Sequence, residues 1–453
     1  MQEIYSMVFQ TDNQTLKDLE IPVTGKNSVF ELFDKTQSLL GKERLRYYLS
    51  HPLSDLVEIN NRKDAISFFI NAECEKEFEI NKNDLDFIEH YLFQENYPIR
   101  PPSKIRALEK ALMQKLKPTS EFYIIERGID YTISLLNNLF DFSTKIAEMI
   151  CPKIIEENNS FIFGLFDISE FRNIRKIKDM QKLSPVSIAT FDYIFRYKYQ
   201  NDIRSILNII YDYDVFITVS KIAVEKDFSF PEILPAQESI IEIEDIYSPF
   251  ITNPVKNDIY FSSSKNLTFI TGPNMAGKSS LLKTLGLTTY LAHAGFPVPA
   301  SKCRISVLSG LFTTINLSDS LDLGYSHFYA EVDRIKFIAE KLKNNSNMLV
   351  IFDELFRGTN IKDAYDGSVA IISAFSKIKN CFFAISTHII EVAEYMYGNK
   401  NEGMQFKQMK VLEKNNSFQY TYNLEDGISD KRLGMYILEK EKVIEIINSI
   451  KDP

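Results

Sequence analysis

The sequence predicts two structurally different parts, a helical N-terminal part followed by an α/β part. Residues 1 to about 230 contain few glycines, and their apolar residues recur at intervals of three and four, which is the spacing of amphipathic helices. From about residue 230 onward, short apolar runs of strand length alternate with segments of helical spacing, which is typical of an α/β domain with a largely parallel sheet. We therefore expect an α + α/β fold, divided into a short N-terminal segment (1–27), a helical region (28–235) and an α/β domain (236–453).

Helical spacing in the first part is clearest in three stretches. Residues 29–49 carry apolar side chains three and four positions apart, and Asp55 is a suitable N-cap for a second helix over residues 56–69. Prolines at 98–102 interrupt the pattern, and a third candidate helix covers Ile188 to Ile210. Because these stretches are rich in Phe and Tyr at helical spacing, we interpret the aromatic side chains as the core of a bundle rather than as a base-stacking surface.

In the second part, the expected strands are short runs of apolar and β-branched residues. Such runs indicate strands that are buried on both faces, as in a parallel sheet between helices. The predicted strands are Ile240–Ile243, Asn257–Phe261, Leu267–Thr271, Met348–Phe352 and Cys381–Ser386.

Composition restricts the class of protein further. Of the 453 residues, 45% are apolar and 25% are charged, which excludes a disordered or fibrous protein. The four cysteines are far apart and form no CxxC pair, so we expect neither a zinc site nor a disulfide framework. There is no signal-peptide pattern and no apolar run long enough to cross a membrane. A cytoplasmic protein without a membrane span is the expectation.

The net charge of −9 is concentrated in the first part of the chain. Residues 1–240 hold 29 Lys and Arg against 37 Asp and Glu, and therefore carry −8 of the total. This sign disfavours extensive contact with nucleic-acid phosphates, although it leaves room for a local basic groove. We interpret the one basic cluster as a solvated helix face in preference to a phosphate contact; it comprises Arg172, Arg175, Lys176, Lys178 and Lys182.

Residues 272–279 form a glycine loop that fits G-x-x-x-x-G-K-[ST], the P-loop or Walker A pattern. The glycine loop follows a predicted strand and precedes a helical run over residues 281–293, so that its N–H groups and the positive end of the helix would face phosphate oxygens. Lys278 would reach the β- and γ-phosphates, and the Ser279 hydroxyl would ligate Mg²⁺. We expect the bound nucleotide to contact Gly272, Pro273, Asn274, Met275, Ala276, Gly277, Lys278, Ser279 and Ser280.

An acidic pair, Asp353 and Glu354, follows the predicted strand 348–352. The carboxyl ends of parallel strands are where such sheets bind ligands, so the acidic pair is expected near the glycine loop. There Asp353 would hold Mg²⁺, directly or through water, and Glu354 would act as the general base that orients the attacking water.

His388 is a third candidate, because it comes just after the predicted strand 381–386. A histidine at this edge of the sheet would contact the γ-phosphate. The alternative is a histidine whose hydrogen bonds are purely structural. We favour the catalytic role because the glycine loop and the acidic pair are expected at the same edge.

Together, these motifs resemble those of the MutS family of DNA mismatch repair ATPases. Thr271–Ser280, TGPNMAGKSS, is similar to the family's loop TGPNMGGKST, with Ala276 in place of a glycine. Asp353–Thr359 resembles DELGRGT, with Phe356 in place of a glycine. Further similarities to family segments occur at Phe33–Gln37, Leu291–Gly295, Phe312–Ile315, Gly324–Phe328 with Glu331, and Gly427–Asp430 with Gly434.

The resemblance implies an ABC-type P-loop ATPase domain that follows a helical core and lever region, with ATP and Mg²⁺ as cofactors. It also implies a homodimer in which each ATP lies between the glycine loop of one subunit and the segment around Ser326 of the other. The segment Val255–Asp258, including Asn257, is similar to the family's loop beside the adenine. By this resemblance, ATP binding closes the dimer and moves the levers.

In the MutS family, a mismatch-recognition domain and a connector domain precede the helical core. Here the similarity to the core begins near Phe30, so we expect neither domain to fit, and no segment resembles the family's DNA clamp. The expected function is that of a DNA-binding ATPase related to mismatch repair. The alternatives are a MutS-like ATPase that acts on branched DNA, a ribonucleoprotein or a protein partner, and an ATP-dependent assembly switch that hydrolyses ATP slowly.

Overall fold

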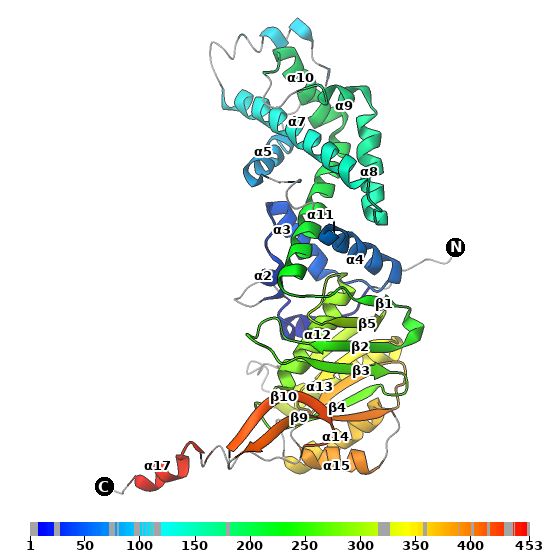
Figure 1. Cartoon of the computed structure of the whole chain (residues 1–453), viewed down its shortest axis with the longest axis vertical. Helices are drawn as coiled ribbons and strands as arrows, with labels where there is room; N and C mark the ends of the chain where they lie inside the picture. Colours follow the sequence, from blue (N-terminus) through cyan, green and yellow to red (C-terminus); the bar gives the residue numbers. More distant parts are fainter. Residues whose placement is uncertain are drawn as a thin grey trace. The chain divides into compact units, whose positions relative to one another are not determined.

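The computed structural model in Figure 1 describes most of the chain, namely residues 8–21, 28–71, 78, 81–94, 100–101, 103–105, 107–109, 112, 119–177, 182–315, 327–356, 360–387, 389–399, 403–414, 417–429, 438 and 440–450. Its contacts divide the chain into two compact units. The α/β unit comprises Met1–Leu32, His51–Asn60 and Glu225–Pro453, and the helical unit comprises Phe33–Ser50 and Asn61–Val224. Both expected classes of structure are therefore present, whereas the domain boundaries expected at residues 27 and 235 stay a prediction.

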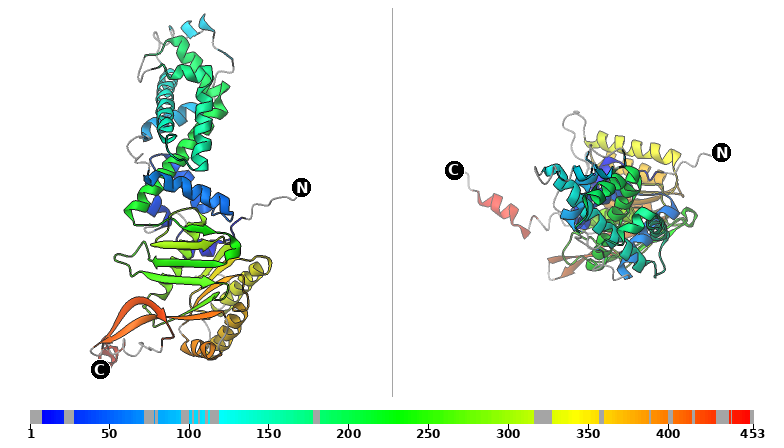
Figure 2. Two further views of the ribbon diagram at one scale, coloured as in Figure 1. Left: turned by 45° about the vertical axis from the view of Figure 1, so that its right-hand side comes forward. Right: turned by 90° about the horizontal axis from the view of Figure 1, so that it is seen from above.

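The helical unit is built around two long helices, α7 (Ser120–Ile146) and α11 (Gln200–Glu225). Buried residues recur along α7 at intervals of three and four, so the helix presents one apolar face to its neighbours. Figures 1 and 2 show the shorter helices arranged around this pair. They are α3 (Leu39–Ser50), α5 (Lys82–Leu92), α8 (Lys153–Phe166), α9 (Ser169–Ile174) and α10 (Pro185–Tyr193), while α2 (Val29–Phe33) and α4 (Leu56–Asn71) contain residues of both units.

Aromatic side chains fill part of the core of the helical unit. The rings of Phe69 and Phe142 stack with centroids 6.4 Å apart, and Tyr213 meets both edge-on. All three side chains are buried, which confirms core packing as their role. The expected helix after Asp55 is also confirmed, because the Asp55 carboxylate accepts hydrogen bonds from the first N–H groups of α4.

The predicted helical stretch over Ile188–Ile210 is confirmed as helical except at Tyr199, but it is not one regular helix. Helix α10 ends at Tyr193, a π-helical turn η2 (Ile194–Lys198) follows, and α11 begins only at Gln200. The wider turn carries Arg196, which is 1% exposed and whose side chain pairs with Asp192 one turn earlier. The sequence did not predict the π-helical turn, because such turns are rare and span only a few residues.

The described strands of the α/β unit form two sheets. The first has the order β10-β9-β4-β8-β7-β6, and all its neighbouring pairs are parallel except β9 and β10. The second has the order β1-β5-β2-β3. In chain order the strands are β1 (Glu232–Leu234), β2 (Ile240–Ile246), β3 (Asn257–Ser262), β4 (Leu267–Thr271), β5 (Lys302–Ser306), β6 (Gly310–Thr314), β7 (Met348–Phe352), β8 (Phe382–Ser386), β9 (Met404–Lys414) and β10 (Ser417–Asp426).

Helix α12 (Lys278–His293) contacts β2 of one sheet and β6 and β8 of the other, and most of its residues are buried. A second apolar core joins the strands β4, β6, β7 and β8 to the helices α13 (His327–Asn344), α14 (Ile361–Phe375) and α15 (Ile390–Gly398), which Figure 1 shows beside the larger sheet. The central strands β4, β7 and β8 are buried along their whole length, which explains their continuous apolar sequences. The remaining short elements are α1 (Asn13–Asp18), η3 (Ala236–Glu238) and α17 (Val443–Ser449).

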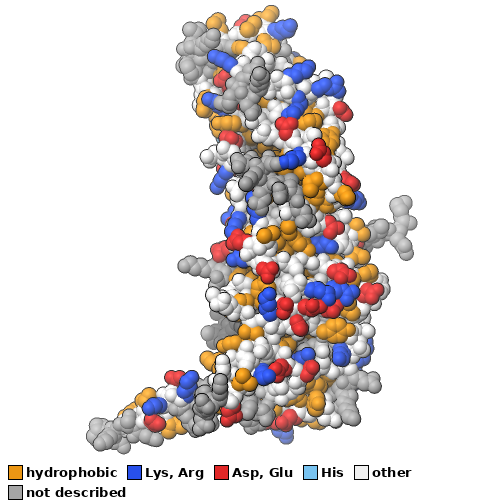
Figure 3. Space-filling model, viewed as in Figure 1, with side chains coloured by type: hydrophobic (Ala, Val, Ile, Leu, Met, Phe, Trp, Pro, Cys, Tyr) orange, Lys and Arg blue, Asp and Glu red, His pale blue; other side chains and the backbone are white. Residues whose placement is uncertain are grey.

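All five predicted strands are confirmed, within three residues at each end. The outer face of the smaller sheet carries alternating acidic and basic side chains, visible in Figure 3. Arg304 on β5 pairs with Glu232 on β1 and Glu242 on β2, so the charges on this face are largely matched across strands. No helix in the described part of the chain is long and apolar enough to cross a membrane.

Candidate functional site

The glycine loop connects the end of β4 to the start of α12. Gly272 and Gly277 have φ values of 144° and 99°, in the region that side chains rarely adopt. A Cβ atom at Gly277 would also lie 3.2 Å from the ring of Tyr422. Gly277 is the N-cap of α12 and offers no side chain to cap the first N–H groups of the helix. Such a helix start attracts an anion.

Lys278 is the first residue of α12, and its side chain folds back into the glycine loop. Its ammonium group donates hydrogen bonds to the carbonyl oxygens of Gly272 at 2.7 Å and Pro273 at 3.2 Å. The residue is 4% exposed, so the positive charge lies inside the loop rather than in solvent. The next residue, Ser279, is exposed at the start of the helix. The loop thus encloses one cation beside a helix N-terminus, an arrangement suited to phosphate.

The acidic pair lies at the same edge of the sheet as the glycine loop. Strand β8 is the neighbour of both β4 and β7, and all three strands run parallel, so β4 and β7 end at one edge. Two strand spacings separate the exits of these strands, which amounts to roughly 10 Å. Asp353 is buried and Glu354 is half-buried. The structure therefore brings Lys278, Ser279, Asp353 and Glu354 to one edge, as the motifs predicted.

Ser386, the last residue of β8, holds both members of the acidic pair. Its hydroxyl group donates to Asp353 Oδ1 at 2.5 Å. The N–H of Glu354 donates to the Ser386 hydroxyl at 3.1 Å and to the Ser386 carbonyl at 3.2 Å. The sequence prediction did not single out Ser386, because it was the polar end of an otherwise apolar strand. The change from apolar to hydroxyl side chain at a strand end was the only available signal.

The N-terminal helix α1 anchors the strand on the other side of β7. The N–H of Asp353 donates to the carbonyl of Thr314, at the end of β6. Around that carbonyl, the buried Asp18 carboxylate accepts hydrogen bonds from the Thr313 hydroxyl at 2.7 Å and the Ile315 N–H at 2.9 Å. Residues nearly 300 positions apart in the sequence therefore fix the backbone next to the acidic pair.

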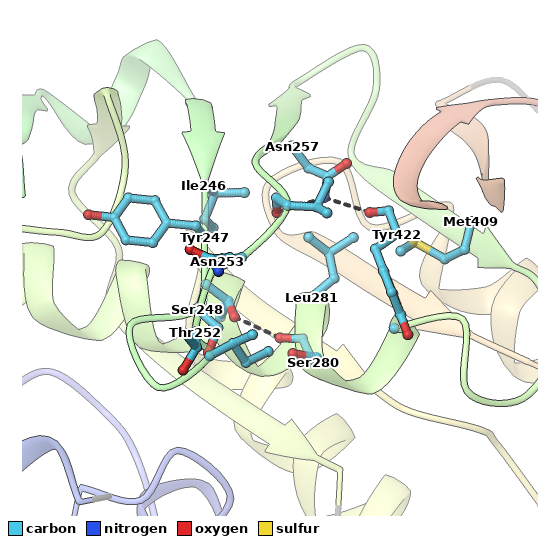
Figure 4. A pocket seen from close by; sticks show the side chains of 15 residues that line it. Ile246, Tyr247, Ser248, Thr252, Asn253, Asn257, Ser280, Leu281, Met409 and Tyr422 are labelled. Carbon is cyan, nitrogen blue, oxygen red and sulfur yellow. Dashed lines mark hydrogen bonds between the residues drawn. The ribbon is translucent and has the colours of Figure 1, made fainter. Parts of the chain in front are cut away.

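A pocket opens beside the start of α12 and is shown in Figure 4. The space within it that water can enter is about 360 Å³. One wall is the segment from Ile246 to Asn257, and the opposite wall carries Met409 and Tyr422 from β9 and β10. Gly277, Ser280, Leu281 and Thr284 form the remaining side. The pocket therefore continues directly from the glycine loop and is lined mostly by apolar and aromatic groups.

Asn257 lines this pocket, but its amide group bonds to the protein backbone. The side-chain oxygen accepts from the Leu424 N–H at 2.7 Å, and the side-chain nitrogen donates to the Tyr422 carbonyl at 3.0 Å. These bonds join β3 to β10 where the register between β9 and β10 shifts. Two further predicted site residues, His388 and Ser326, lie outside the described residues.

Ser429, in the last segment that resembles the family, lies next to the glycine loop. Its N–H donates to the Thr271 hydroxyl at 2.9 Å, and the residue is buried. Thr271 is the residue that precedes the loop. Two of the segments quoted for the family, around Thr271 and around Ser429, thus meet at one edge of the larger sheet, although they are more than 150 positions apart in the sequence.

In the helical unit, three members of the basic cluster contact neighbouring polar groups. Arg175 donates to Asp141 at 2.5 Å, and also to Asn137. Arg172 donates to the carbonyl of Asp167, and Lys176 to the side chain of Asn173. These contacts favour a solvated helix face as the role of the cluster, since its cations already have local partners.

Comparisons with known proteins agree with the motifs. The family model of MutS domain III matches residues 14–227, and that of MutS domain V matches residues 268–451. The DNA mismatch repair protein MutS of Petrotoga mobilis is 24% identical over 97% of this chain and 64% of its own length. The corresponding protein of Finegoldia magna is 31% identical over 67% of this chain and 33% of its own length.

The chain spans less than two thirds of the length of these relatives; for the protein of Carboxydothermus hydrogenoformans, which is 24% identical, the share is 61%. The two family models nevertheless lie in the expected order and match most of the chain, from the helical unit to the glycine loop and the acidic pair. The protein belongs to the MutS family.

Proposed function

We propose that this protein binds and hydrolyses ATP as an ABC-type P-loop ATPase and acts on DNA in a process related to mismatch repair. The observation that carries the ATPase proposal is the placement of Lys278 and the acidic pair at one edge of the sheet, beside a pocket that opens from the glycine loop. The DNA part rests on the names of the relatives, which are DNA mismatch repair proteins.

The proposed chemistry assigns one task to each side chain. Lys278 exchanges its bonds to the loop carbonyls for bonds to the β- and γ-phosphates, where its charge balances theirs. Glu354 accepts a proton from the water that attacks the γ-phosphorus, and His388 contacts the γ-phosphate. Ser279 and Asp353 would hold Mg²⁺, since hydroxyl and carboxylate oxygens are the ligand type it prefers. When bound, Mg²⁺ neutralises charge on the phosphates.

The pocket of Figure 4 is proposed to hold the nucleoside. Tyr422, Met409 and Ile251 present aromatic and apolar surface suited to the faces of a purine base. Its opening toward Gly277 and Ser280 supports this role, because a nucleoside there would lie on the side from which phosphates would enter the glycine loop. Of the family's adenine-flanking segment, Val255 and Asn257 line the pocket.

In the proposed assembly, two copies of the chain enclose two ATP molecules, and Ser326 of each copy contacts the nucleotide of the other. Closure of the dimer on ATP moves the helical units, and hydrolysis resets them. The substrate held by the helical units is DNA, with a mismatch or a branch. The charge of −8 in residues 1–240 and the local partners of the basic cluster favour a second candidate, in which the helical units hold a protein or a ribonucleoprotein.

ATP hydrolysis by matched variants tests the ATPase proposal. Lys278→Ala should abolish nucleotide binding, whereas Lys283→Ala, on the same helix but paired with Glu20, should leave it intact. Glu354→Gln should still bind ATP, and its hydrolysis rate should be lower by roughly 10²- to 10⁴-fold, the usual contribution of a general base. The control variant Glu340→Gln, on α13, should bind and hydrolyse ATP like the wild type. Normal hydrolysis by Glu354→Gln would exclude Glu354 as the base.

Binding of duplex, mismatched and four-way-junction DNA, measured by fluorescence anisotropy across a salt series, tests the DNA proposal. Phosphate contacts release counterions, so affinity for DNA should fall linearly with salt concentration on logarithmic axes and should change between ATP and ADP. Absent or salt-independent binding by a chain that hydrolyses ATP would favour the protein or ribonucleoprotein partner. Slow turnover that no partner accelerates would favour the assembly switch.

A further inference from the structure

Ser386 forms hydrogen bonds with both acidic residues to which we assign the chemistry. It is fully buried at the end of β8, and its hydroxyl group donates one hydrogen bond and accepts another. The O–H donates to Asp353 Oδ1 at 2.5 Å, and the same oxygen accepts the Glu354 N–H at 3.1 Å. A hydroxyl group has one proton and two lone pairs, so both bonds can form at once and strengthen each other.

The register of the sheet ends just before the acidic pair. The register between β7 and β8 ends at Phe352 and Ile385, so Asp353 and Glu354 lie beyond the last paired residues of the two strands. Glu354 also has a φ of 57°, a left-handed conformation that is unfavourable for a residue with a side chain. Two acceptors on Ser386, its carbonyl and its hydroxyl, hold the N–H of Glu354 in this conformation.

The hydroxyl group also restricts the Asp353 carboxylate. A neutral donor at one carboxylate oxygen fixes the rotation of the carboxylate and leaves its net charge in place. Carboxylates that hold a metal depend on partners of this kind, and loss of the partner typically lowers metal affinity or activity by roughly 10- to 100-fold. The other four residues of β8 are apolar, so within this strand only Ser386 can provide such a bond.

We propose that Ser386 is a positioning residue that aligns Asp353 for Mg²⁺ and Glu354 for the attacking water through one hydroxyl group. The proposal rests on the ATPase function proposed above. It assigns to Ser386 an effect on Mg²⁺ affinity and on turnover, and no effect on nucleotide binding in the absence of Mg²⁺. The reason is that, among the described residues, the hydroxyl group of Ser386 bonds to the acidic pair, and Ser386 does not line the pocket.

The test compares Ser386→Ala and Ser386→Thr with Ser368→Ala. Ser368 on α14 is equally buried, and its hydroxyl has no hydrogen-bond partner among the described residues, so its removal controls for the loss of a buried serine. The first measurement is the Mg²⁺ dependence of fluorescent ADP binding, which needs no hydrolysis. The second is hydrogen exchange of the backbone over residues 349–356. The third is kcat and KM for ATP.

For Ser386→Ala, we expect the apparent Mg²⁺ affinity and kcat each to fall by roughly 10- to 100-fold, with unchanged ADP affinity in EDTA. Exchange of the Glu354 N–H should accelerate. Ser386→Thr, which restores the hydroxyl, should lie closer to the wild type on all three measurements. The proposal is overturned if Ser386→Ala keeps wild-type Mg²⁺ affinity and exchange, or if Ser386→Thr is no better than Ser386→Ala.

A failure of the proposed ATPase function can be distinguished from a failure of the role proposed for Ser386. If the wild-type chain binds ADP and Mg²⁺ but does not hydrolyse ATP, the hydrolytic proposal fails, while the Mg²⁺ titration and the exchange measurement still decide the role of Ser386. If Ser386→Ala does not fold, as judged by circular dichroism, Ser386→Cys replaces it. That variant keeps the side-chain size with a weaker donor and should show the same losses relative to Ser386→Thr.

Discussion

The two units of this protein each contain a buried aspartate, and they hold it in different ways. In the helical unit, Asp192 accepts two hydrogen bonds from the guanidinium group of Arg196, at 2.6 and 2.8 Å, and a third from the Tyr91 hydroxyl at 3.0 Å. In the α/β unit, Asp353 accepts from the neutral hydroxyl of Ser386 at the edge of the sheet.

The difference separates a structural carboxylate from one that is suited to bind a cation. A guanidinium partner compensates the charge of Asp192 within the fold, so that this aspartate stabilises one packing arrangement and has little left to offer a ligand. The Ser386 hydroxyl is neutral, so this bond orients the Asp353 carboxylate and adds no opposite charge to it. Burial alone therefore does not identify a functional carboxylate, and a neutral partner does not either, since the buried Asp18 also accepts from the Thr313 hydroxyl and the Ile315 N–H. What distinguishes Asp353 is its place at the edge of the sheet where the glycine loop lies.

The largest effect is expected when the guanidinium group of Arg196 is removed from the helical unit. Arg196→Met keeps much of the side-chain volume but leaves Asp192 buried without its guanidinium partner, which typically costs about 3–5 kcal/mol. We expect the helical unit to exchange its backbone hydrogens much faster, while ATP still binds to the α/β unit. Hydrogen exchange followed by mass spectrometry measures both units in one sample.

Two further variants test whether the buried pair is the cause of this effect. Lys198→Met removes the neighbouring but exposed ion pair with Glu170 and should destabilise the helical unit far less, because solvent screens exposed ion pairs. The double variant with Arg196→Met and Asp192→Asn removes the uncompensated charge and should recover part of the loss. If Arg196→Met exchanged no faster than Lys198→Met, the buried pair would not be what holds this region together.

The second prediction concerns a buried histidine of the α/β unit. His293 is fully buried at the end of α12, and burial lowers the pKa of its imidazole to about 4. The Leu308 N–H donates to Nε2 at 2.8 Å, so the proton of the neutral ring is on Nδ1, 2.9 Å from the Thr289 carbonyl that accepts it. The folded chain thus requires a neutral histidine.

The unfolded chain takes up a proton near pH 6.5, whereas the folded chain takes it up only near pH 4. The free energy of unfolding should therefore be unaffected by His293 above pH 6.5 and should fall between pH 6.5 and 4, by about 3 kcal/mol in total. His293→Gln should remove this part of the pH dependence, whereas His90→Gln, at an exposed position of α5, should not. Urea unfolding between pH 7.5 and 4 measures the difference in slope, and equal slopes in all three proteins would contradict the prediction.

The sequence predicted the parts of this structure that depend on neighbouring residues. Five consecutive apolar residues identified strands such as β7, and the spacing of Gly272, Gly277 and Lys278 identified the glycine loop, because both signals are contained in one short segment. Ser386 and Asp18 were not predicted, since each acts on residues that only the fold brings close. The hairpin of β9 and β10 was missed because its strands are half-exposed and carry no long apolar run.

Asn257 provides the third and smallest prediction, because sequence and structure suggest different roles for it. The sequence suggested contact with the nucleotide, whereas the amide group bonds to the backbone of β10 on both its oxygen and its nitrogen. Asn257→Ala removes both bonds and should destabilise β10 by about 1 kcal/mol, which is typical of such hydrogen bonds. Asn257→Asp keeps the acceptor for Leu424 but not the donor to Tyr422, and should lie between the alanine variant and the wild type. Hydrogen exchange over residues 417–426 and ADP affinity, measured on the same samples, separate the two roles. Faster exchange with an ADP affinity within tenfold of the wild type supports a structural bridge. A larger loss of ADP affinity without faster exchange supports direct contact with the nucleotide.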